Sequence, residues 1–282
     1  MNLIKAWVWL GPSIALLIAG PAAACGGPDG AAARVSEVYP TAHELPENLL
    51  RFYVYFSQPM ARESVLSAVE LRDQDGSPIP GVFLPNRYEL WSPDGRRLTL
   101  ILDPGRVKTG LKSHRMRGRA LEASRSYVLS IGRTALDAEG CPLAERFEKA
   151  FTAAAEDRSA PEPERWRLTL PSAGGREALA VELDGLYDHL SLAYRLRVLD
   201  DVGGPVAGAI ELAGHESRWR FTPEAPWRAA DYRLVVTSSL EDLAGNRPGR
   251  RFDRAPSGKG RRPDFLPGPP LEIPFEIPAI PN

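Results

Sequence analysis

The sequence repeats one pattern of turn residues in its two halves, and this repeat limits the possible folds more than any other feature. A strand-like stretch beginning SYVLSI ends in TALDAEGC, and a second beginning DYRLVV ends in SSLEDLAGN. In both, a Tyr stands ten residues before the Asp of the turn: Tyr127 before Asp137, and Tyr232 before Asp242. Upstream, GSPIPG in the first half matches GGPVAG in the second. The chain is therefore predicted to contain two homologous units.

The Asp-x-x-Gly segments are best explained as turns. An Asp side chain accepts hydrogen bonds from backbone N–H groups that follow it, and Gly supplies a positive φ at little steric cost. Asn also tolerates this backbone region, whereas Cys141, at the matching position of the first unit, does so less readily. The predicted structural turn residues are Asp137, Gly140, Asp242, Gly245 and Asn246.

Strand signals separated by turns dominate the rest of the chain. RFYVYF, RLTLIL, ALAVEL and WRFTP are short, rich in β-branched or aromatic residues, and often alternate apolar with polar positions. The 27 Pro and 25 Gly suit many short strands, and only MARESVLSA and DHLSLA favour short helices. The pattern predicts an all-β protein of two tandem antiparallel β-sandwiches.

The order of these motifs resembles the bacterial Ig-like domain of the S-layer (SbsA-like) type. YFSQPM, GSPIPG, SYVLSI and FEKAFTA follow one another in the first half, and VELDGLYD, GGPVAG, DYRLVV and EDLAGN in the second. The resemblance covers roughly residues 34–279 and implies Ig-like sandwiches that serve as structural or adhesive modules. It carries over no catalytic residue. Cys141 departs from it, because the family's turn usually has Asn there.

Residues 1–24 are predicted to be a secretory signal peptide, with Lys5 before an apolar run that ends in small residues. Ala22-Ala-Ala-Cys25 resembles a bacterial lipobox, which implies lipidation of Cys25 and an outer-membrane lipoprotein. The alternative is cleavage after Ala24, export to the periplasm or outside the cell, and a disulfide between Cys25 and Cys141. Residues 25–33 are expected to form a flexible tether.

The predicted first domain, residues 34–153, carries a basic insertion with no acidic residue. Insertions at strand ends lie on the surface and often carry function, so the segment is a candidate site for a polyanion or an acidic carbohydrate. The alternative is a solvated loop whose charges pair with acidic residues elsewhere. The candidate anion-binding residues are Arg106, Lys108, Lys112, Arg115, Arg117 and Arg119.

Residues 154–165 form a linker rich in Ala, Pro and charged residues, which predicts a stiff connection of limited reach. The predicted second domain spans residues 166–279 and includes a basic Gly/Pro-rich stretch, 249–270. If LEIPFEI matches FEKAFTA, this stretch is a long loop before the closing strand. Otherwise everything after Asp253 is a tail beyond the fold.

Signals for chemistry are weak. The four His form no metal-binding motif, and no nucleophile elbow or phosphate loop is present. Calcium at Asp73, Asp75, Asp200 and Asp201 competes with a simple turn, and the turn is preferred. A net charge of −1 argues against a dedicated nucleic-acid binder. We therefore expect a non-catalytic envelope module without cofactor or metal that binds an envelope protein or glycan; the rival hypotheses are a carbohydrate- or polyanion-binding protein and a hydrolase with a cleft between the domains.

Overall fold

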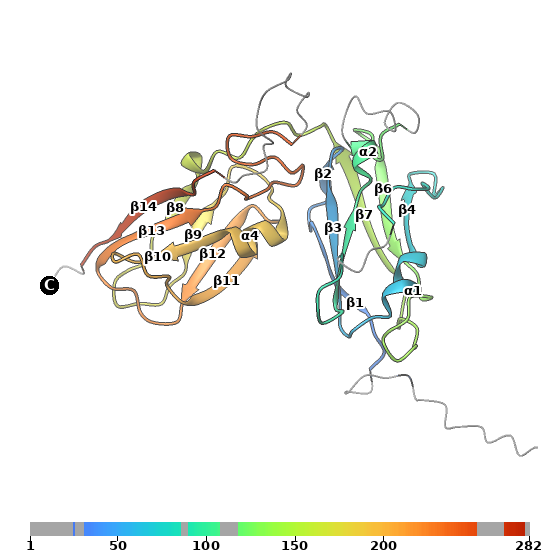
Figure 1. Cartoon of the computed structure of the whole chain (residues 1–282), viewed down its shortest axis with the longest axis horizontal. Coiled ribbons are helices and arrows are strands. Elements are labelled where there is room, and N and C mark those ends of the chain that lie inside the picture. The colour runs from blue at the N-terminus through green and yellow to red at the C-terminus, as the bar shows by residue number, and fades with distance from the viewer. Residues whose placement is uncertain (1–24, 26–30, 86–89, 108–117, 253–267, 280–282) are drawn as a thin grey trace, which may run out of the picture.

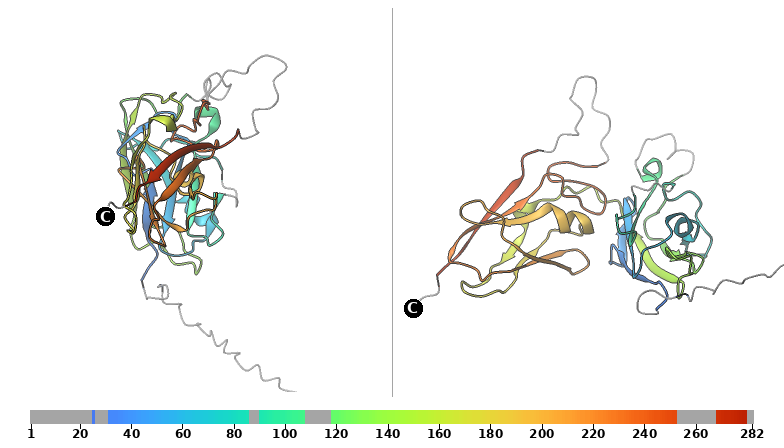
Figure 2. Two further views of the ribbon diagram at one scale, coloured as in Figure 1. Left: turned by 90° about the vertical axis from the view of Figure 1, so that its left-hand side faces the viewer. Right: turned by 60° about the horizontal axis from the view of Figure 1, so that its bottom comes forward.

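The computed structural model describes residues 25, 31–85, 90–107, 118–252 and 268–279, and within them the fold is all-β (Figure 1). Its elements form two β-sandwiches that lie side by side, as the right-hand view of Figure 2 also shows. The predicted all-β sandwich fold is therefore confirmed. None of the helices in the described part of the chain has the length and hydropathy of a membrane span.

The N-terminal sandwich is built from two sheets. One has the order β1-β3-β5 and the other β2-β7-β6-β4, and every pair is antiparallel except β2 with β7. The strands are β1 (Val35–Tyr39), β2 (Glu44–Pro46), β3 (Arg51–Phe56), β4 (Val69–Asp73), β5 (Arg97–Ile101), β6 (Ser126–Ile131) and β7 (Phe147–Ala154).

The C-terminal sandwich has the sheets β11-β12-β9-β8 and β10-β13-β14, all antiparallel. Within the sheets, the order β8-β9-β12 of the second half corresponds to β1-β3-β5 of the first, and β14-β13-β10 corresponds to β7-β6-β4. The two halves therefore share a topology. The strands are β8 (Arg167–Thr169), β9 (Leu179–Glu182), β10 (Leu196–Leu199), β11 (Gly208–Ala213), β12 (Arg218–Pro223), β13 (Ala230–Val236) and β14 (Leu271–Ile277).

Short helices follow β3 in the first half and β9 in the second, where MARESVLSA and DHLSLA predict them. They are α1 (Arg62–Ser67) and α4 (His189–Arg195). Asp188 caps α4, because its side chain accepts the N–H of Ser191. A single helical turn, α2 (Pro104–Val107), begins the basic insertion, and a 3-10 turn, Pro163–Arg165, precedes β8.

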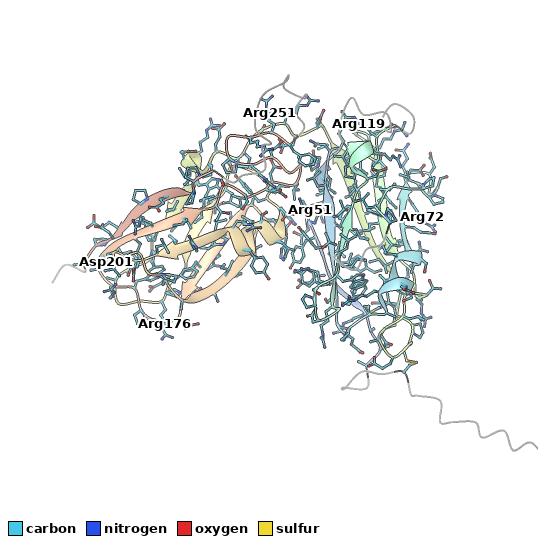
Figure 3. The ribbon with its side chains drawn as sticks, in the orientation of Figure 1. Arg51, Arg72, Arg119, Arg176, Asp201 and Arg251 are labelled. Carbon is cyan, nitrogen blue, oxygen red and sulfur yellow. A yellow bond between two sulfur atoms is a disulfide. The ribbon has the colours of Figure 1, made fainter. Side chains whose placement is uncertain are left out.

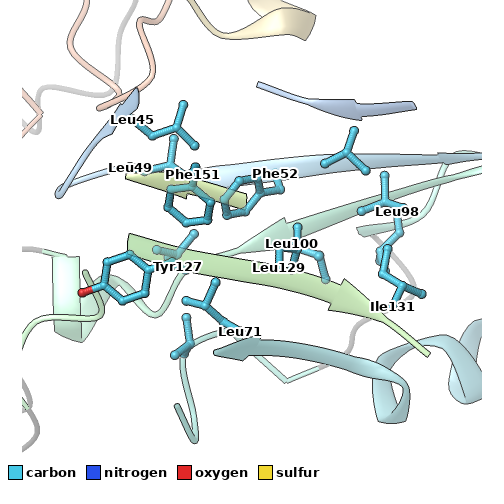
Figure 4. Close-up of a cluster of buried hydrophobic side chains, with 14 of the residues drawn as sticks. Leu45, Leu49, Phe52, Leu71, Leu98, Leu100, Tyr127, Leu129, Ile131 and Phe151 are labelled. Carbon is cyan, nitrogen blue, oxygen red and sulfur yellow. The ribbon is translucent and has the colours of Figure 1, made fainter. Parts of the chain in front are cut away.

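Each sandwich encloses its own hydrophobic core. In the first, side chains of β3, β5, β6 and β7 meet between the sheets, with Phe52 packed against Phe151 (Figure 4). In the second, the rings of Trp219 and Phe221 are parallel with centroids 5.8 Å apart, and Trp227 packs edge-on against Tyr232. Alternating strand residues supply both cores, so the period-two pattern of the sequence sets which face is buried.

The closing strand decides between the two interpretations of the C-terminal region. LEIPFEI is β14, which pairs with β13 from Ala230↔Ile277 to Val236↔Leu271. The basic stretch therefore precedes the last strand of the second sandwich and is no tail beyond it. Most of this stretch, residues 253–267, lies outside the described residues, as do residues 1–24 and 26–30.

Candidate functional site at the contact between the two sandwiches

Arg106, a candidate anion-binding residue, is used inside the fold. Its side chain is buried, and its guanidinium donates to the carbonyl oxygens of Pro80 at 3.0 Å, Arg119 at 2.9 Å and Gly118 at 3.4 Å. These bonds tie the two ends of the basic insertion to the segment before β5. Arg106 therefore has a structural role in the fold, and its binding of an external anion stays a prediction.

Arg119 also has partners within the protein. Its guanidinium pairs with Glu47 at 2.5 Å and with Glu156 at 3.1 Å, near the top of the N-terminal sandwich in Figure 3. This is the charge pairing that the alternative interpretation of the insertion expected. The other candidates, Lys108, Lys112, Arg115 and Arg117, lie outside the described residues.

The two Asp-x-x-Gly segments form the same turn. Asp137 Oδ1 accepts the N–H of Glu139 at 3.1 Å and of Cys141 at 2.8 Å. Asp242 Oδ1 accepts the N–H of Ala244 at 2.8 Å and of Asn246 at 2.9 Å. In each turn the Gly, Gly140 or Gly245, has a positive φ and donates its N–H to the carbonyl oxygen of the Asp.

The turns at Asp73 and Asp200, where calcium binding was the other hypothesis, resemble the two repeat turns. Asp73 Oδ1 accepts the N–H groups of Asp75 and Ser77, and Asp200 Oδ1 accepts that of Gly204. These carboxylates serve the turn. Within the described ranges, no group of three or more His, Cys, Asp or Glu side chains is placed to hold a metal ion.

A tyrosine supports the same strand in each half. The hydroxyl of Tyr127 accepts the N–H of Glu122 at 2.8 Å, and the hydroxyl of Tyr232 accepts that of Arg228 at 3.1 Å. Both rings are buried. A buried tyrosine hydroxyl needs a partner, and here it fixes the segment that leads into the strand. The Tyr that recurs in the two halves of the sequence therefore has the same structural role in both.

Cys25 is bonded to Cys141, with their Cα atoms 5.4 Å apart, a usual separation for a disulfide. The structure thus contains the disulfide that was predicted as the alternative to lipidation. A sulfur atom in a disulfide cannot also form the thioether bond that attaches a lipid. The bond joins the segment before β1 to the turn at Asp137. The matching residue of the second turn is Asn246, so the covalent link belongs to the first turn.

The second repeat turn lies between the two sandwiches and packs into the first core. Leu243 belongs to the hydrophobic cluster of the N-terminal sandwich, and its carbonyl oxygen accepts the N–H of Leu50 at 3.1 Å. A Cβ atom on Gly245 would lie 2.3 Å from Leu50 Cδ1. Glycine is therefore required here for close approach as well as for its positive φ.

The linker is held by both sandwiches at the same place. Asn48 and Asp157 exchange two hydrogen bonds, of 2.8 and 2.9 Å, and Asn246 donates to the carbonyl oxygen of Asp157 at 3.2 Å. Asn246 also donates to Asp242 Oδ2 at 2.9 Å. Burial, followed by the charge of Asp157, raises the pKa of Asp242 to about 7.

Arg51 lies between the sandwiches and connects β3 to two acidic residues of the other half (Figure 3). Its guanidinium forms an ion pair with Glu241, and its Nε lies 3.7 Å from Asp188 Oδ2. Tyr53, on the same strand, donates to Asp188 at 2.9 Å. Glu241 also accepts from Arg247, at 2.6 and 3.1 Å. Arg51 and Tyr53 of β3 thus anchor the first turn of α4 and the second repeat turn.

Asp188 and Glu241 are the buried carboxylates that the hydrolase hypothesis requires, but their oxygens already have protein partners. Besides Tyr53, Asp188 accepts the N–H of Ser191 at 2.9 Å, which is the helix cap. Burial raises the pKa of Asp188, while Arg51 opposes this shift. A carboxylate that caps a helix and is ion-paired has a structural role in the contact.

A second polar cluster joins the loop after β1 to the tip of the β11–β12 hairpin. Glu216 is buried, and its carboxylate accepts the N–H of Thr41 at 2.8 Å and the hydroxyl of Thr41 at 2.8 Å. Burial raises the pKa of Glu216. Lys149 holds the same loop from the other side, donating to the carbonyl oxygens of Thr41 and Ala42 at 3.1 Å each.

Aromatic rings complete the contact. The His189 ring stacks on Tyr39, with centroids 3.5 Å apart, and meets Tyr55 edge-on. Its Nδ1 is buried without a hydrogen-bond partner among the described residues. Burial lowers the pKa of His189 to about 4, so the ring is neutral at pH 7.

Sequence reasoning identified the turns at the contact but did not predict the contact itself. One signal was available: EDLAGN carries Leu243 and Ala244 where the first copy has Ala138 and Glu139. The more apolar copy is the one that is buried. Arg51, Asp188 and Glu216 have no distinguishing sequence pattern, because their partners come from distant parts of the chain.

No family model and no curated protein matches the sequence. Among solved structures, domains 1-6 of surface layer protein SbsC match with a TM-score of 0.30 and 12% identity, covering 72% of this chain and 23% of that one. Native alpha-2-macroglobulin from Escherichia coli, spanning domains MG0-NIE-MG1, matches with a TM-score of 0.28 and 15% identity, covering 72% and 66%. The chain spans less than a quarter of the SbsC chain, and similarity at this level carries no argument about function.

Proposed function

We propose that the protein is a non-catalytic structural module of the cell envelope. In this proposal, residues 34–153 and 166–279 are two Ig-like domains, and residues 154–165 join them in a fixed orientation. The supporting observation is the contact between the sandwiches, where buried polar groups of one half bind those of the other. Its partner would be an envelope protein or glycan.

The chemistry of the contact favours a mechanical role over a catalytic one. Each of its carboxylates accepts a hydrogen bond from a protein group or forms an ion pair with one; they belong to Asp188, Glu216 and Glu241. Burying so many charges is costly unless they pair well, and breaking one pair leaves its partner unsolvated. Such a contact resists bending between the domains, which suits a protein that holds a fixed distance or angle.

Export rests on the N-terminal pattern and on the cysteines. A disulfide persists in oxidising compartments and is rare in the cytosol. The bond between Cys25 and Cys141 therefore supports a periplasmic or extracellular protein. An outer-membrane lipoprotein is the competing form of the same proposal, because lipidation and the disulfide use the same sulfur.

The test is intact mass after expression of the full chain in a Gram-negative host, with cell fractionation. We expect a processed chain outside the cytoplasm whose mass increases by two hydrogens on reduction. An acylated chain that begins at Cys25 would overturn the disulfide form and establish the lipoprotein. An unprocessed, cytoplasmic chain would overturn export altogether. A Cys141→Ser variant is the control, since it should lose the mass change on reduction.

A further inference from the structure

Strand β11 forms one edge of the four-stranded sheet β11-β12-β9-β8 (Figure 1). It pairs with β12 over six residues, and the N–H of Glu224 donates to the carbonyl oxygen of Ala207, which sets the alternation of the ladder. Counting from that bond, the backbone groups of Ala209, Glu211 and Ala213 face β12. Those of Gly208, Ile210 and Leu212 face outward, and no backbone hydrogen bond to them is present in the described part of the chain.

The other described edge strands are shielded. A β-bulge interrupts β1, Pro274 lies within β14, and β2 and β8 have only three residues each. Isolated bridges cover β4, β5 and β10, through Pro78, Trp91 and Pro205. Natural sheets use such features to prevent edge-to-edge pairing. Strand β11 has no Pro and no bulge, and no isolated bridge covers it within the described residues.

The side chains of β11 also suit a partner strand. Ile210 and Leu212 lie opposite Phe221 and Trp219, so they point to the core face, yet Ile210 is 39% exposed. On the neighbouring helix α4, which contacts β11, Tyr194 is 71% exposed. An apolar edge of this kind is the feature that β-strand addition uses.

We propose that β11 pairs antiparallel with β11 of a second copy, about a two-fold axis at Ile210. The outward groups are symmetric about this residue: Ile210 meets Ile210 of the second copy, and Gly208 meets Leu212. Gly208 has no side chain, and the Phe221 ring of the same chain lies where its Cβ would be, 2.5 Å away, so Leu212 of the other copy packs on that ring. The two four-stranded sheets become one continuous sheet.

The charges fit this register as well. Glu211 lies opposite Ala209 of the second copy and so does not face another Glu211, and it keeps Arg220 of its own chain at 3.6 Å. Like charges directly opposite each other would be destabilising. This distribution favours a second copy in this register over an unrelated strand. The pairing depends on β11 alone and holds whether or not the protein is exported.

The contact is small, so the dimer is weak. Six residues of edge strand and a few side chains fall below the roughly 1,200 Å² that stable interfaces bury. We therefore expect a dissociation constant of about 10 μM or weaker, and a dimer that forms at high local concentration.

The first test is sedimentation velocity of the full chain over a range of concentrations. We expect a reversible monomer–dimer equilibrium for the wild type. For Ile210→Pro we expect a dimer dissociation constant at least tenfold higher, which corresponds to about 1.4 kcal/mol. The N–H of residue 210 faces outward, so proline leaves the bonds between β11 and β12 intact. Ile210→Lys replaces it if the proline variant does not fold, and Val202→Lys, at an exposed turn, is the matched control.

The second test is oxidative cross-linking of Ile210→Cys. Directly opposed, hydrogen-bonded residues have Cα atoms about 5.5 Å apart, within reach of a disulfide. We expect a cross-linked dimer from this variant and none from Val202→Cys under the same conditions. A wild type that remains monomeric at all concentrations, a dimer unaffected by Ile210→Pro, or equal cross-linking of both cysteine variants would each overturn the proposal.

Discussion

Equivalent residues of the two repeat turns have acquired different partners. Gly140 and Gly245 share a positive φ, and Cys141 and Asn246 share a place at the end of the turn. Cys141 is joined to Cys25, whereas Asn246 binds Asp242 and the linker. The local backbone is thus set by the Asp and Gly of each turn. What each turn does depends on the surface against which it lies.

Gly245→Ala is expected to destabilise the protein by more than Gly140→Ala. Both substitutions place a side chain in the left-handed region, at a cost of about 1–2 kcal/mol. At Gly245 the new Cβ also collides with Leu50, which adds about 1–3 kcal/mol of overpacking, while at Gly140 no atom lies within 4 Å. Urea unfolding of both variants measures the difference. Equal losses would show that the second turn is not packed against the first core.

At the level of elements, corresponding strands and helices of the two halves have diverged in what they contact. Helix α1 follows β3, and helix α4 follows β9, at matching places. Only α4 begins with Asp188 and His189, which reach across to Tyr53 and Tyr39 of the other sandwich. Helix α4 is therefore also part of the contact between the sandwiches.

The contact between α4 and β1 should depend on pH through His189. The folded pKa of about 4 lies below the ordinary value of 6.5, so the unfolded chain takes up the proton first as the pH falls. The stability provided by the neutral ring is complete above about pH 6.5 and is lost as the pH falls towards 4. His189→Phe keeps the stacking and should remove this loss.

The measurement is the urea midpoint of wild type and His189→Phe at about pH 7 and about pH 4.5. Only the difference between the two proteins is informative. The raised pKa of Asp242 changes stability in the opposite direction over this interval, because stability from that group is lost as the pH rises towards 7. On acidification we expect the stability of the wild type to fall relative to that of the variant. Parallel profiles would contradict a buried, neutral His189; the exposed His43→Gln variant is the control.

For the whole molecule, the contact between the sandwiches makes two cores behave as one unit. Leu243 of the second repeat turn completes the first core, and Arg51 of the first sandwich neutralises Asp188 and Glu241 beside the second. Unfolding of either half therefore removes partners that the other half needs. Cooperative unfolding is the expected consequence.

Arg51→Met should separate the unfolding of the two sandwiches. The substitution leaves the buried carboxylate of Asp188 without its cation, while Glu241 keeps Arg247. Breaking a buried pair in this way costs about 3–5 kcal/mol in other proteins. We expect a single thermal transition for the wild type and a broadened or double transition for Arg51→Met by calorimetry. Arg72→Met is the matched control, because Arg72 pairs with Glu70 on the outer side of the first sandwich, where such pairs contribute about 0–1 kcal/mol (Figure 3). Similar effects of both substitutions would contradict a coupling role for Arg51.

The sequence by itself determined the strands, their turns and the correspondence of the two halves, because these depend on residues close together in the chain. Alternation fixes the buried face of β5 or β12, and Asp and Gly fix the turns. The tertiary structure alone decided which turn is buried between the sandwiches, that Arg106 serves the fold, and that Cys25 meets Cys141. Those outcomes depend on pairs such as Arg51 and Glu241, far apart in the chain, and the energy of a buried charge is decided by its neighbours in space.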